Sequence, residues 1–464
     1  MKKTIVLNVV GLTPGLLGEH TPFLSQWSKG AGRAAVHPVV PAVTCSAQAT
    51  YLTGQWPDAH GIVGNGWYFR DTCEIRFWHQ SNKLVEGPKI WDVAKQRDPA
   101  FTCANLFWWY NMYATADFSV TPRPQYLADG RKLPDCYSHP ASLRDHLQAK
   151  FGPFPLFEFW GPRTSIRSSQ WIANATMEVD RLHNPTLTLV YLPHLDYNLQ
   201  RLGPNDPKIA TDLREIDGVC GELIEFYEGR GAQVIVLSEY GITAVDRPVA
   251  LNRTLRQHGY LATREERGTE LLDAGASEAF AVADHQVAHV YVKNPARIAE
   301  IKALIARVPG VERVLAGAER EEVHLSHPRA GEVVAIADAR SWFSYYYWLD
   351  DQRAPDFARI VDIHKKPGYD PVEMLADPTI RFLMPKVALK LLRKRLGFRM
   401  LMDIIPLDAS LIRGSHGRVP DAQSEYPLLM TRSAALLSAE VIQPTDVFDV
   451  ILAHLGVESR VLAR

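Results

Sequence analysis

The chain has 464 residues, of which 46% are hydrophobic and 22% charged, and its formal net charge is −1. This near-neutral balance, with no long basic run, argues against a nucleic-acid-binding protein. The five cysteines are scattered and form no CxxC pair, so they indicate neither a disulfide framework nor a cysteine zinc site. No run of about 18 apolar residues occurs, so we expect a soluble, cytoplasmic protein without a transmembrane segment.

The N-terminal part of the chain predicts two strands followed by a helix. Residues 4–10 are mostly apolar, as is typical of a strand buried on both faces, and residues 33–36 predict a second strand. The stretch 38–54 then passes from β-branched residues through Thr44 into a short helix that ends at Gly54. A hydroxyl at a strand-to-helix turn lies where helix N–H groups attract an anion. Taken alone, this stretch favours Thr44 as a helix N-cap, since Thr is preferred at that position.

Aromatic residues and prolines dominate the region from 70 to 162. We expect this region to be a cap insertion whose rings line a ligand pocket, with Trp108 and Trp109 as substrate-binding residues. The alternative, that the rings fill the core of an insertion, stays open. The glycine-rich loop before this region offers Asn65 as a further substrate-binding residue.

The middle of the chain alternates buried strands with helices. Residues 186–192 and 233–237 predict central strands, and residues 206–229 predict a long amphipathic helix. This alternation indicates an α/β fold with a mostly parallel central sheet flanked by helices. Thr44, Asp196 and Glu239 each follow a predicted strand, and ligands of such sheets gather at the carboxyl ends of the strands. We therefore expect these three side chains to converge.

The C-terminal half adds further segments to what we interpret as a single domain, residues 1–464. Residues 260–337 predict a small α+β insertion. Residues 387–402 combine leucines with five basic residues, and we favour a solvated face on a core helix over a helix that lies on a membrane. His416 follows in a glycine loop, and a strand and a terminal helix close the chain.

In their order, these pieces resemble the type I phosphodiesterase/nucleotide pyrophosphatase branch of the alkaline phosphatase superfamily. The motifs that carry the resemblance are PAVT…YLTG with DAHGIVGN (residues 41–65), YLPHLD (191–196), SEYGI (238–242) and GSHG (414–417). The resemblance implies an alkaline-phosphatase-like sheet and a nucleophile at Thr44. It also implies a pair of zinc ions about 4 Å apart that clamp the attacking and leaving oxygens of a phosphoryl group.

The metal ligands implied by the resemblance are incomplete in this sequence. Val10 stands where the family has an Asp on the first strand, Glu239 and Tyr240 replace an Asp-His pair, and Gln200 replaces a His. Ala47 replaces an Asn that holds a phosphate oxygen.

The metal set that remains is Thr44, Asp196, Glu239 and His416. A set rich in oxygen suits Mg²⁺ or Mn²⁺ as well as Zn²⁺, with one or two ions. Asn8, His194, Asp284, His285 and His364 are further candidate ligands, although no spacing singles them out.

Two functions follow from this pattern. The first is a metal-dependent hydrolase that cleaves a small-molecule phosphodiester or phosphomonoester through Thr44. The second is a catalytically altered relative that has kept the fold and binds a phosphorylated or aromatic ligand.

Overall fold

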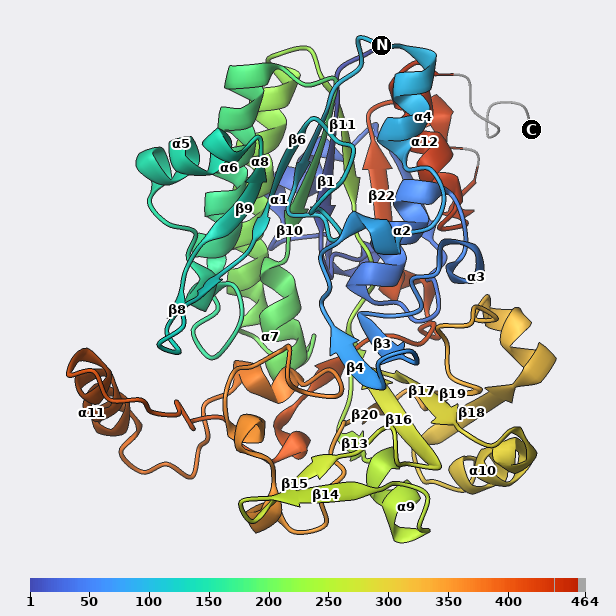
Figure 1. Ribbon diagram of the computed structural model, residues 1–464. Helices are drawn as coiled ribbons and strands as arrows, with labels where there is room; N and C mark the ends of the chain where they lie inside the picture. The colour runs from blue at the N-terminus through green and yellow to red at the C-terminus, as the bar shows by residue number, and fades with distance from the viewer. Residues whose placement is uncertain (438, 458–464) are drawn as a thin grey trace.

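The computed structural model of the protein describes residues 1–437 and 439–457. An upper lobe contains a nine-stranded sheet, and a smaller lobe lies below the lower edge of that sheet (Figure 1). The strand order is β23 (Val441–Ile442), β2 (Gly32–Val36), β22 (Leu428–Thr431), β11 (Gln233–Leu237), β1 (Thr4–Val9), β10 (Leu187–Leu192), β5 (Cys103–Leu106), β6 (Phe118–Pro122) and β9 (Cys136–His139).

The centre of the sheet consists of the strands with the most apolar sequences. Every residue of β1 and of β10 is buried, and β1 pairs in parallel with both β10 and β11. Asn8 is in register with Tyr191 on one side and Leu237 on the other, so the three strands end together at one edge. The predicted α/β fold with a mostly parallel sheet is confirmed.

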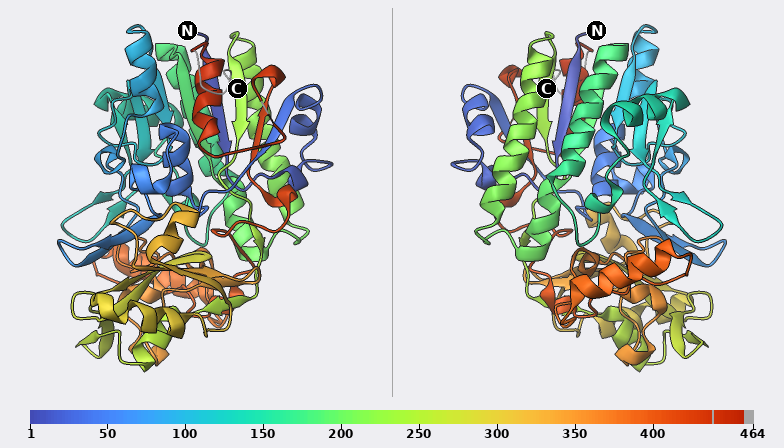
Figure 2. Two further views of the ribbon diagram at one scale, coloured as in Figure 1. Left: turned by 90° about the vertical axis from the view of Figure 1, so that its right-hand side faces the viewer. Right: turned by 90° about the vertical axis from the view of Figure 1, so that its left-hand side faces the viewer.

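Helices cover both faces of this sheet. On one face lie α6 (Ile166–His183) and α8 (Ile209–Glu228), and on the other lie α2 (Thr44–Thr53), α4 (Ile90–Arg97) and α12 (Asp446–His454) (Figures 1 and 2). Their buried apolar side chains join those of the strands in one core. Burial of this apolar surface is the main stabilising contribution to the upper lobe.

The expectation that residues 70–162 form a cap insertion is wrong for much of that region. Strands β5, β6 and β9 extend the main sheet beyond β10, and α5 (Ala141–Phe151) packs beside β9 in the same lobe. The aromatic residues between them largely fill the core, which was the alternative interpretation. The hairpin of β3 (Gly66–Phe69) and β4 (Glu74–Phe77), at the start of the region, does reach toward the lower lobe (Figure 1).

The lower lobe has its own sheet and its own core. The order of that sheet is β16 (Ala279–Asp284), β17 (Val287–Val292), β19 (Val333–Ala337) and β18 (Val311–Ala316), with α10 (Ile298–Ile305) beside it. This sheet and helix fall within the predicted 260–337 segment. The lobe also takes in α9 (Leu251–Gln257), β20 (Ser341–Phe343) and the aromatic run that follows β20.

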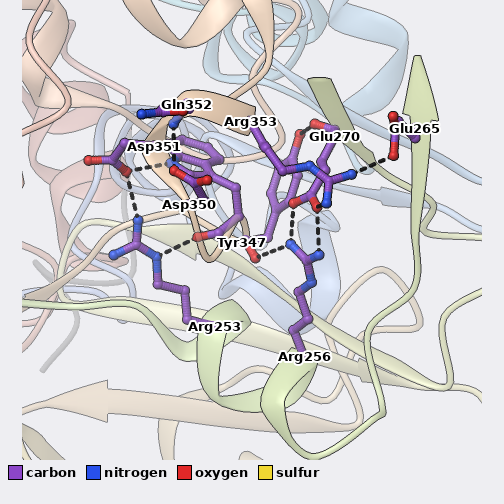
Figure 3. A network of polar contacts seen from close by, with 10 residues as sticks. Arg253, Arg256, Glu265, Glu270, Tyr347, Asp350, Asp351, Gln352 and Arg353 are labelled. Atoms are coloured by element: carbon purple, nitrogen blue, oxygen red, sulfur yellow. Dashed lines mark hydrogen bonds and ion pairs between the residues drawn. The ribbon is translucent and has the colours of Figure 1, made fainter. Parts of the chain in front are cut away.

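Ion pairs connect the outer segments of the lower lobe (Figure 3). Glu270 is nearly fully buried between Arg256 and Arg353, and its side chain lies 2.8 Å from Arg256 Nη2 and 3.2 Å from Arg353 Nη1. Arg353 also contacts Glu265 at 2.5 Å. The pKa of Glu270 is lowered, mainly by its hydrogen bond from Arg256. The cluster joins α9, the hairpin of β14 (Thr263–Glu266) and β15 (Thr269–Leu272), and the loop after β20.

The basic segment forms α11 (Leu383–Arg395), but it is not a core helix. None of its residues is buried, and the helix stands apart from both lobes (Figure 1). The expectation of a core helix with one solvated face is therefore wrong, because the amphipathic pattern does not reveal whether a partner surface exists. No helix in the described part of the chain has the length and apolar character needed to cross a bilayer.

Candidate functional site

Thr44 lies at the first turn of α2, at the edge of the sheet where β1, β10 and β11 end. Val43 occupies the N-cap position with extended backbone and makes no side-chain cap, and Thr44 is the first helical residue. Gly54 ends the helix with a φ of 64°, a left-handed conformation that favours glycine. Thr44 is therefore not the N-cap, and its hydroxyl has another partner.

That partner is the phenol of Tyr240. Thr44 Oγ1 lies 3.2 Å from Tyr240 OH, and Tyr240 OH donates to Asp196 Oδ1 at 3.1 Å. Because Tyr240 gives its hydrogen to Asp196, Thr44 is the donor in the contact with Tyr240. A hydrogen-bond chain thus leads from the Thr44 hydroxyl to a buried carboxylate.

His416 faces the same carboxylate with an unpaired nitrogen. Its Nδ1 contacts the Ala42 carbonyl oxygen at 2.7 Å, which makes Nδ1 the protonated nitrogen. Its Nε2 finds no hydrogen-bond partner among the described residues and lies 3.9 Å from Asp196 Oδ1. Burial lowers the pKa of His416 well below its ordinary value, so Nε2 carries a free lone pair. The Tyr240 ring stacks on this imidazole, with the ring centroids 3.6 Å apart.

Burial raises the pKa of Asp196 to about 7, although the nearby Gln200 amide and the hydrogen bond from Tyr240 oppose this shift. Gln200 Oε1 accepts a hydrogen bond from Tyr369 OH at 3.1 Å, and its amide nitrogen is buried without a hydrogen-bond partner among the described residues. The Gln200 oxygen is therefore already occupied. This arrangement differs from the expectation of Gln200 as a weak oxygen ligand.

Glu239 sits among amide groups. Its Oε1 accepts from Asn8 Nδ2 at 2.5 Å and from Gln48 Nε2, while Gln48 in turn accepts from the Trp109 backbone N–H. Burial raises the pKa of Glu239 to about 8, although the hydrogen bonds from Gln48 and Asn8 oppose this shift. One oxygen of this predicted metal ligand is thus already taken by two amides, and Oε2 remains.

A second polar group surrounds Asn65. Asn65 Oδ1 accepts from the Cys45 backbone N–H at 3.1 Å, and its own N–H and Nδ2 donate to Asp284 at 2.7 and 3.1 Å. Asp284 Oδ1 also contacts His285 Nδ1 at 2.8 Å, and the His285 ring lies 3.7 Å from the His416 ring between centroids. The fold thus brings the turn between β16 and β17 of the lower lobe to the start of α2.

The predicted substrate-binding residues lie in supporting positions. Both ends of the Asn65 amide are used within the protein. Trp108 is fully buried in the main core, so its ring offers no surface to a ligand, and the prediction for Trp108 is not supported. Trp109 is also buried, and its Nε1 donates to the His79 carbonyl oxygen at 2.8 Å. Each of the three residues positions neighbours of Thr44 or fills the core.

A model of the family described as type I phosphodiesterase/nucleotide pyrophosphatase matches residues 4–370. The chain belongs to this family. A curated relative in Schizosaccharomyces pombe, an uncharacterized pyrophosphatase/phosphodiesterase, is 25% identical over 260 residues, which cover 53% of this chain but only 43% of the relative.

Solved structures of the same architecture cover nearly the whole chain. Murine ectonucleotide pyrophosphatase/phosphodiesterase 5, in an inactive form in complex with AMP, has a TM-score of 0.59 at 16% identity and covers 99% of this chain and 96% of its own. Phosphonoacetate hydrolase from Sinorhizobium meliloti 1021, in complex with phosphonoformate, has a TM-score of 0.60 at 15% identity, with 98% and 95% covered. At these identities the likeness shows the fold, which is that of the alkaline phosphatase superfamily.

The residues around Thr44 do not fit the pair of zinc ions that the family resemblance implies. Val10 is fully buried at the end of β1 and offers no donor atom, and Tyr240 presents a phenol that is already bonded to Asp196. Asp196 and His416 are the pair that still faces inward with a carboxylate and a free imidazole nitrogen. Since catalytic zinc sites normally have three protein ligands, this pair is sufficient for one weakly held ion at most.

The other candidate ligands lie in three places. Asn8, Asp284 and His285 lie in the networks around Thr44, as described above. Among the described residues, a group of three side chains able to hold a metal occurs elsewhere, at His194, Asp212 and Glu215. His194 Nε2 lies 3.0 Å from Glu215 and 3.6 Å from Asp212 there. His364 contacts the Phe77 carbonyl oxygen instead.

Proposed function

We propose that this family member is a phosphoester hydrolase that cleaves a phosphodiester or phosphomonoester with the Thr44 hydroxyl as nucleophile. The observation that carries the proposal is the hydrogen-bond chain from Thr44 Oγ1 through Tyr240 OH to Asp196 Oδ1. The membership in a family of phosphodiesterases and pyrophosphatases supports the reaction class.

The residues around Thr44 have complementary parts in this reaction. Thr44 Oγ1 attacks phosphorus, its proton passes to the Tyr240 oxygen, and the Tyr240 proton passes to Asp196. In the ion-free site Asp196 has a pKa of about 7, and a carboxylate with this pKa accepts a proton efficiently near neutral pH. The N-terminal N–H groups of α2 and the positive end of its dipole favour the negative phosphoryl oxygens. The bond to the leaving oxygen breaks, and the alcohol leaves with the proton that Asp196 received. Water then attacks the phosphorus bound to Thr44, gives a proton back to the Thr44 oxygen, and releases phosphate from a monoester or a phosphomonoester from a diester.

The proposal also includes a metal ion. We propose a single divalent ion, Zn²⁺, Mg²⁺ or Mn²⁺, held by Asp196 and His416 beside Thr44. When bound, such an ion supplies positive charge that stabilises the phosphoryl oxygens and the attacking oxygen. The fixed Nδ1–H of His416, anchored to the Ala42 carbonyl, is the arrangement by which proteins orient a metal-binding imidazole.

Release of p-nitrophenolate from bis-p-nitrophenyl phosphate and from p-nitrophenyl phosphate tests the reaction class. We expect Thr44→Ala to abolish turnover and Thr44→Ser to retain part of it. Thr53→Ala is the matched control, because Thr53 lies on the same helix and its hydroxyl bonds only to the backbone, donating to Ala49 O and accepting from the Gln55 N–H. Equal turnover by the wild type and Thr44→Ala would show that the proposal is wrong.

Chelation tests the ion separately. Turnover that is lost in chelator and returns with one of the three ions supports the single-ion site. Turnover that persists in chelator leaves the hydrolase intact and removes the ion from the proposal.

A second candidate, a catalytically altered relative that binds a phosphorylated ligand, is favoured by the buried Val10 and by the loss of metal donors. Calorimetric binding of AMP without any turnover of ester substrates would select this candidate over the enzyme.

A further inference from the structure

A second feature of the molecule is an exposed segment that is both basic and apolar. It is the segment 381–401, which contains α11 and is called the α11 segment below. No residue of α11 is buried, and the helix projects beside the lower lobe on the two stretches of chain that flank it (Figures 1 and 2). A 13-residue helix is marginal in water by itself, so a helix without tertiary packing calls for a partner surface.

Large apolar side chains are exposed here more densely than elsewhere in the described chain. Those in the α11 segment are between 47% and 74% exposed: Phe382, Met384, Leu389, Leu391, Leu392, Leu396, Phe398 and Leu401. The remaining exposed large apolar residues are spread singly over residues 1–349. Single exposed apolar residues are normal on a protein surface, whereas a contiguous group marks an interaction site.

The same segment is strongly basic. Between Asp377 and Asp403 the sequence has seven basic residues and no acidic residue: Arg381, Lys386, Lys390, Arg393, Lys394, Arg395 and Arg399. The whole chain has a net charge of −1, so this positive charge is local. A surface of this kind is complementary to an anionic partner.

Part of the positive charge lies on the side of the helix opposite the exposed leucines. At about 100° per residue, Lys386 and Lys390 lie on one side, and Met384, Leu391 and Leu392 lie on the other, together with Arg395. Lys390 Nζ contacts the Leu401 carbonyl oxygen and Asp403 Oδ1, both at 2.6 Å. Lys386 Nζ donates to the Asp403 carbonyl oxygen at 2.9 Å.

A helix of a globular protein normally buries its apolar stripe and exposes its charges. In α11 the basic side holds the returning chain at Asp403, and the apolar side is the open one. This arrangement leaves the leucines free for an outside partner while Lys386 and Lys390 fix the helix to the protein.

We propose that the α11 segment binds the surface of an anionic lipid bilayer. The apolar side enters the boundary between head groups and acyl chains, and the exposed basic residues Arg393, Lys394, Arg395 and Arg399 meet the lipid phosphates, as in interfacial amphipathic helices. A second copy of this chain fits the segment less well, because the pairing would bring two strongly positive helices together. The proposal is independent of the chemistry at Thr44.

Cosedimentation of the full chain with vesicles tests this inference. We expect binding to vesicles of phosphatidylcholine mixed with phosphatidylglycerol, little binding to phosphatidylcholine alone, and weaker binding as salt is raised. Lys394→Glu with Arg395→Glu should weaken binding by about fivefold or more for each residue changed. Leu391→Ser with Leu392→Ser should weaken it further, because the apolar contact is lost.

Matched controls are available on the rest of the surface. Leu349 is 52% exposed, like Leu391, so Leu349→Ser should leave vesicle binding unchanged. Arg307→Glu is the corresponding exposed charge control. None of the α11 substitutions should alter the melting temperature, since no residue of that helix is buried.

Two results would overturn the proposal. One is vesicle binding that is absent, or that the α11 variants do not change. The other is a dimer in light scattering that Leu391→Ser with Leu392→Ser disperses, which would assign the segment to self-association.

Discussion

The phenol oxygen of Tyr240 lies 3.2 Å from Oγ1 of Thr44, which places a hydroxyl beside the candidate nucleophile. In the family pattern this position carries a metal-binding histidine. A phenol beside Thr44 can share a proton with it, whereas a neutral phenol is a poor ligand for zinc. In the proposed reaction Tyr240 therefore transfers a proton and does not bind a metal.

Tyr240→Phe should lower kcat by about a hundredfold and leave KM nearly unchanged, because proton transfer by a positioned side chain contributes about that much. The ring, and its stacking on His416, remain in this variant. Steady-state kinetics with p-nitrophenyl esters measure the split between kcat and KM. Tyr197→Phe is the control, since the Tyr197 hydroxyl has no hydrogen-bond partner among the described residues. Equal losses in both variants would show that Tyr240 only fills space.

Asn65→Ala should destabilise the protein by about 2 kcal/mol, because buried groups on both sides of the amide lose their partners. The Cys45 N–H and one Asp284 oxygen are the groups concerned. Urea unfolding measures the loss. If Asn65 instead bound substrate as the sequence suggested, the main effect would appear in KM while the free energy of unfolding stayed the same.

Glu239→Gln should make stability less dependent on pH. Burial raises the pKa of Glu239 from 4.5 to about 8, so between these values the folded protein keeps a proton that the unfolded chain has released. The resulting stabilisation is complete below the unfolded pKa and is lost as pH rises through about 8. Glutamine cannot ionise, and its oxygen can still accept from Asn8 and Gln48.

Urea unfolding across the pH range measures this difference. The variant should gain about 4 kcal/mol over the wild type near pH 9 relative to pH 5. Asp196 and Asp284, whose pKa values burial also raises to about 7, are present in both proteins and cancel in the comparison. Parallel curves for the two proteins would contradict a raised pKa at Glu239.

Much of the sheet was predictable because its central strands are uninterrupted apolar runs, as in residues 187–192 and 233–237. Strand β5 has only four residues, and β6 and β9 lie among aromatic residues and prolines, so composition suggested an insertion there. The helix pattern of α11 was equally clear, but periodicity defines an apolar side without stating what covers it.

The site residues likewise include some that the sequence predicts and some that it does not. Thr44, Asp196 and Glu239 were predicted to converge because each follows a strand, and the structure joins Thr44 and Asp196 through Tyr240. Asp284 and His285 carried no such signal, since they lie in a turn of the lower lobe, 240 residues after the strand-to-helix turn at Thr44. Only tertiary structure brings the two segments together.

Gln200→His should restore tight zinc binding beside Thr44. Gln200 is fully buried and its amide lies near Asp196, so an imidazole there adds a third donor to Asp196 and His416. We expect the dialysed wild-type protein to retain well under one zinc ion per chain at this site and the variant to retain about one more than the wild type. Elemental analysis by mass spectrometry measures the difference, which is insensitive to any ion held at His194, Asp212 and Glu215 because both proteins share that cluster. Gln80→His, at a residue whose amide donates to Pro122 O, controls for the added histidine. A wild-type protein that already retains two ions lost on His416→Ala would contradict the conclusion that the zinc pair no longer fits this site.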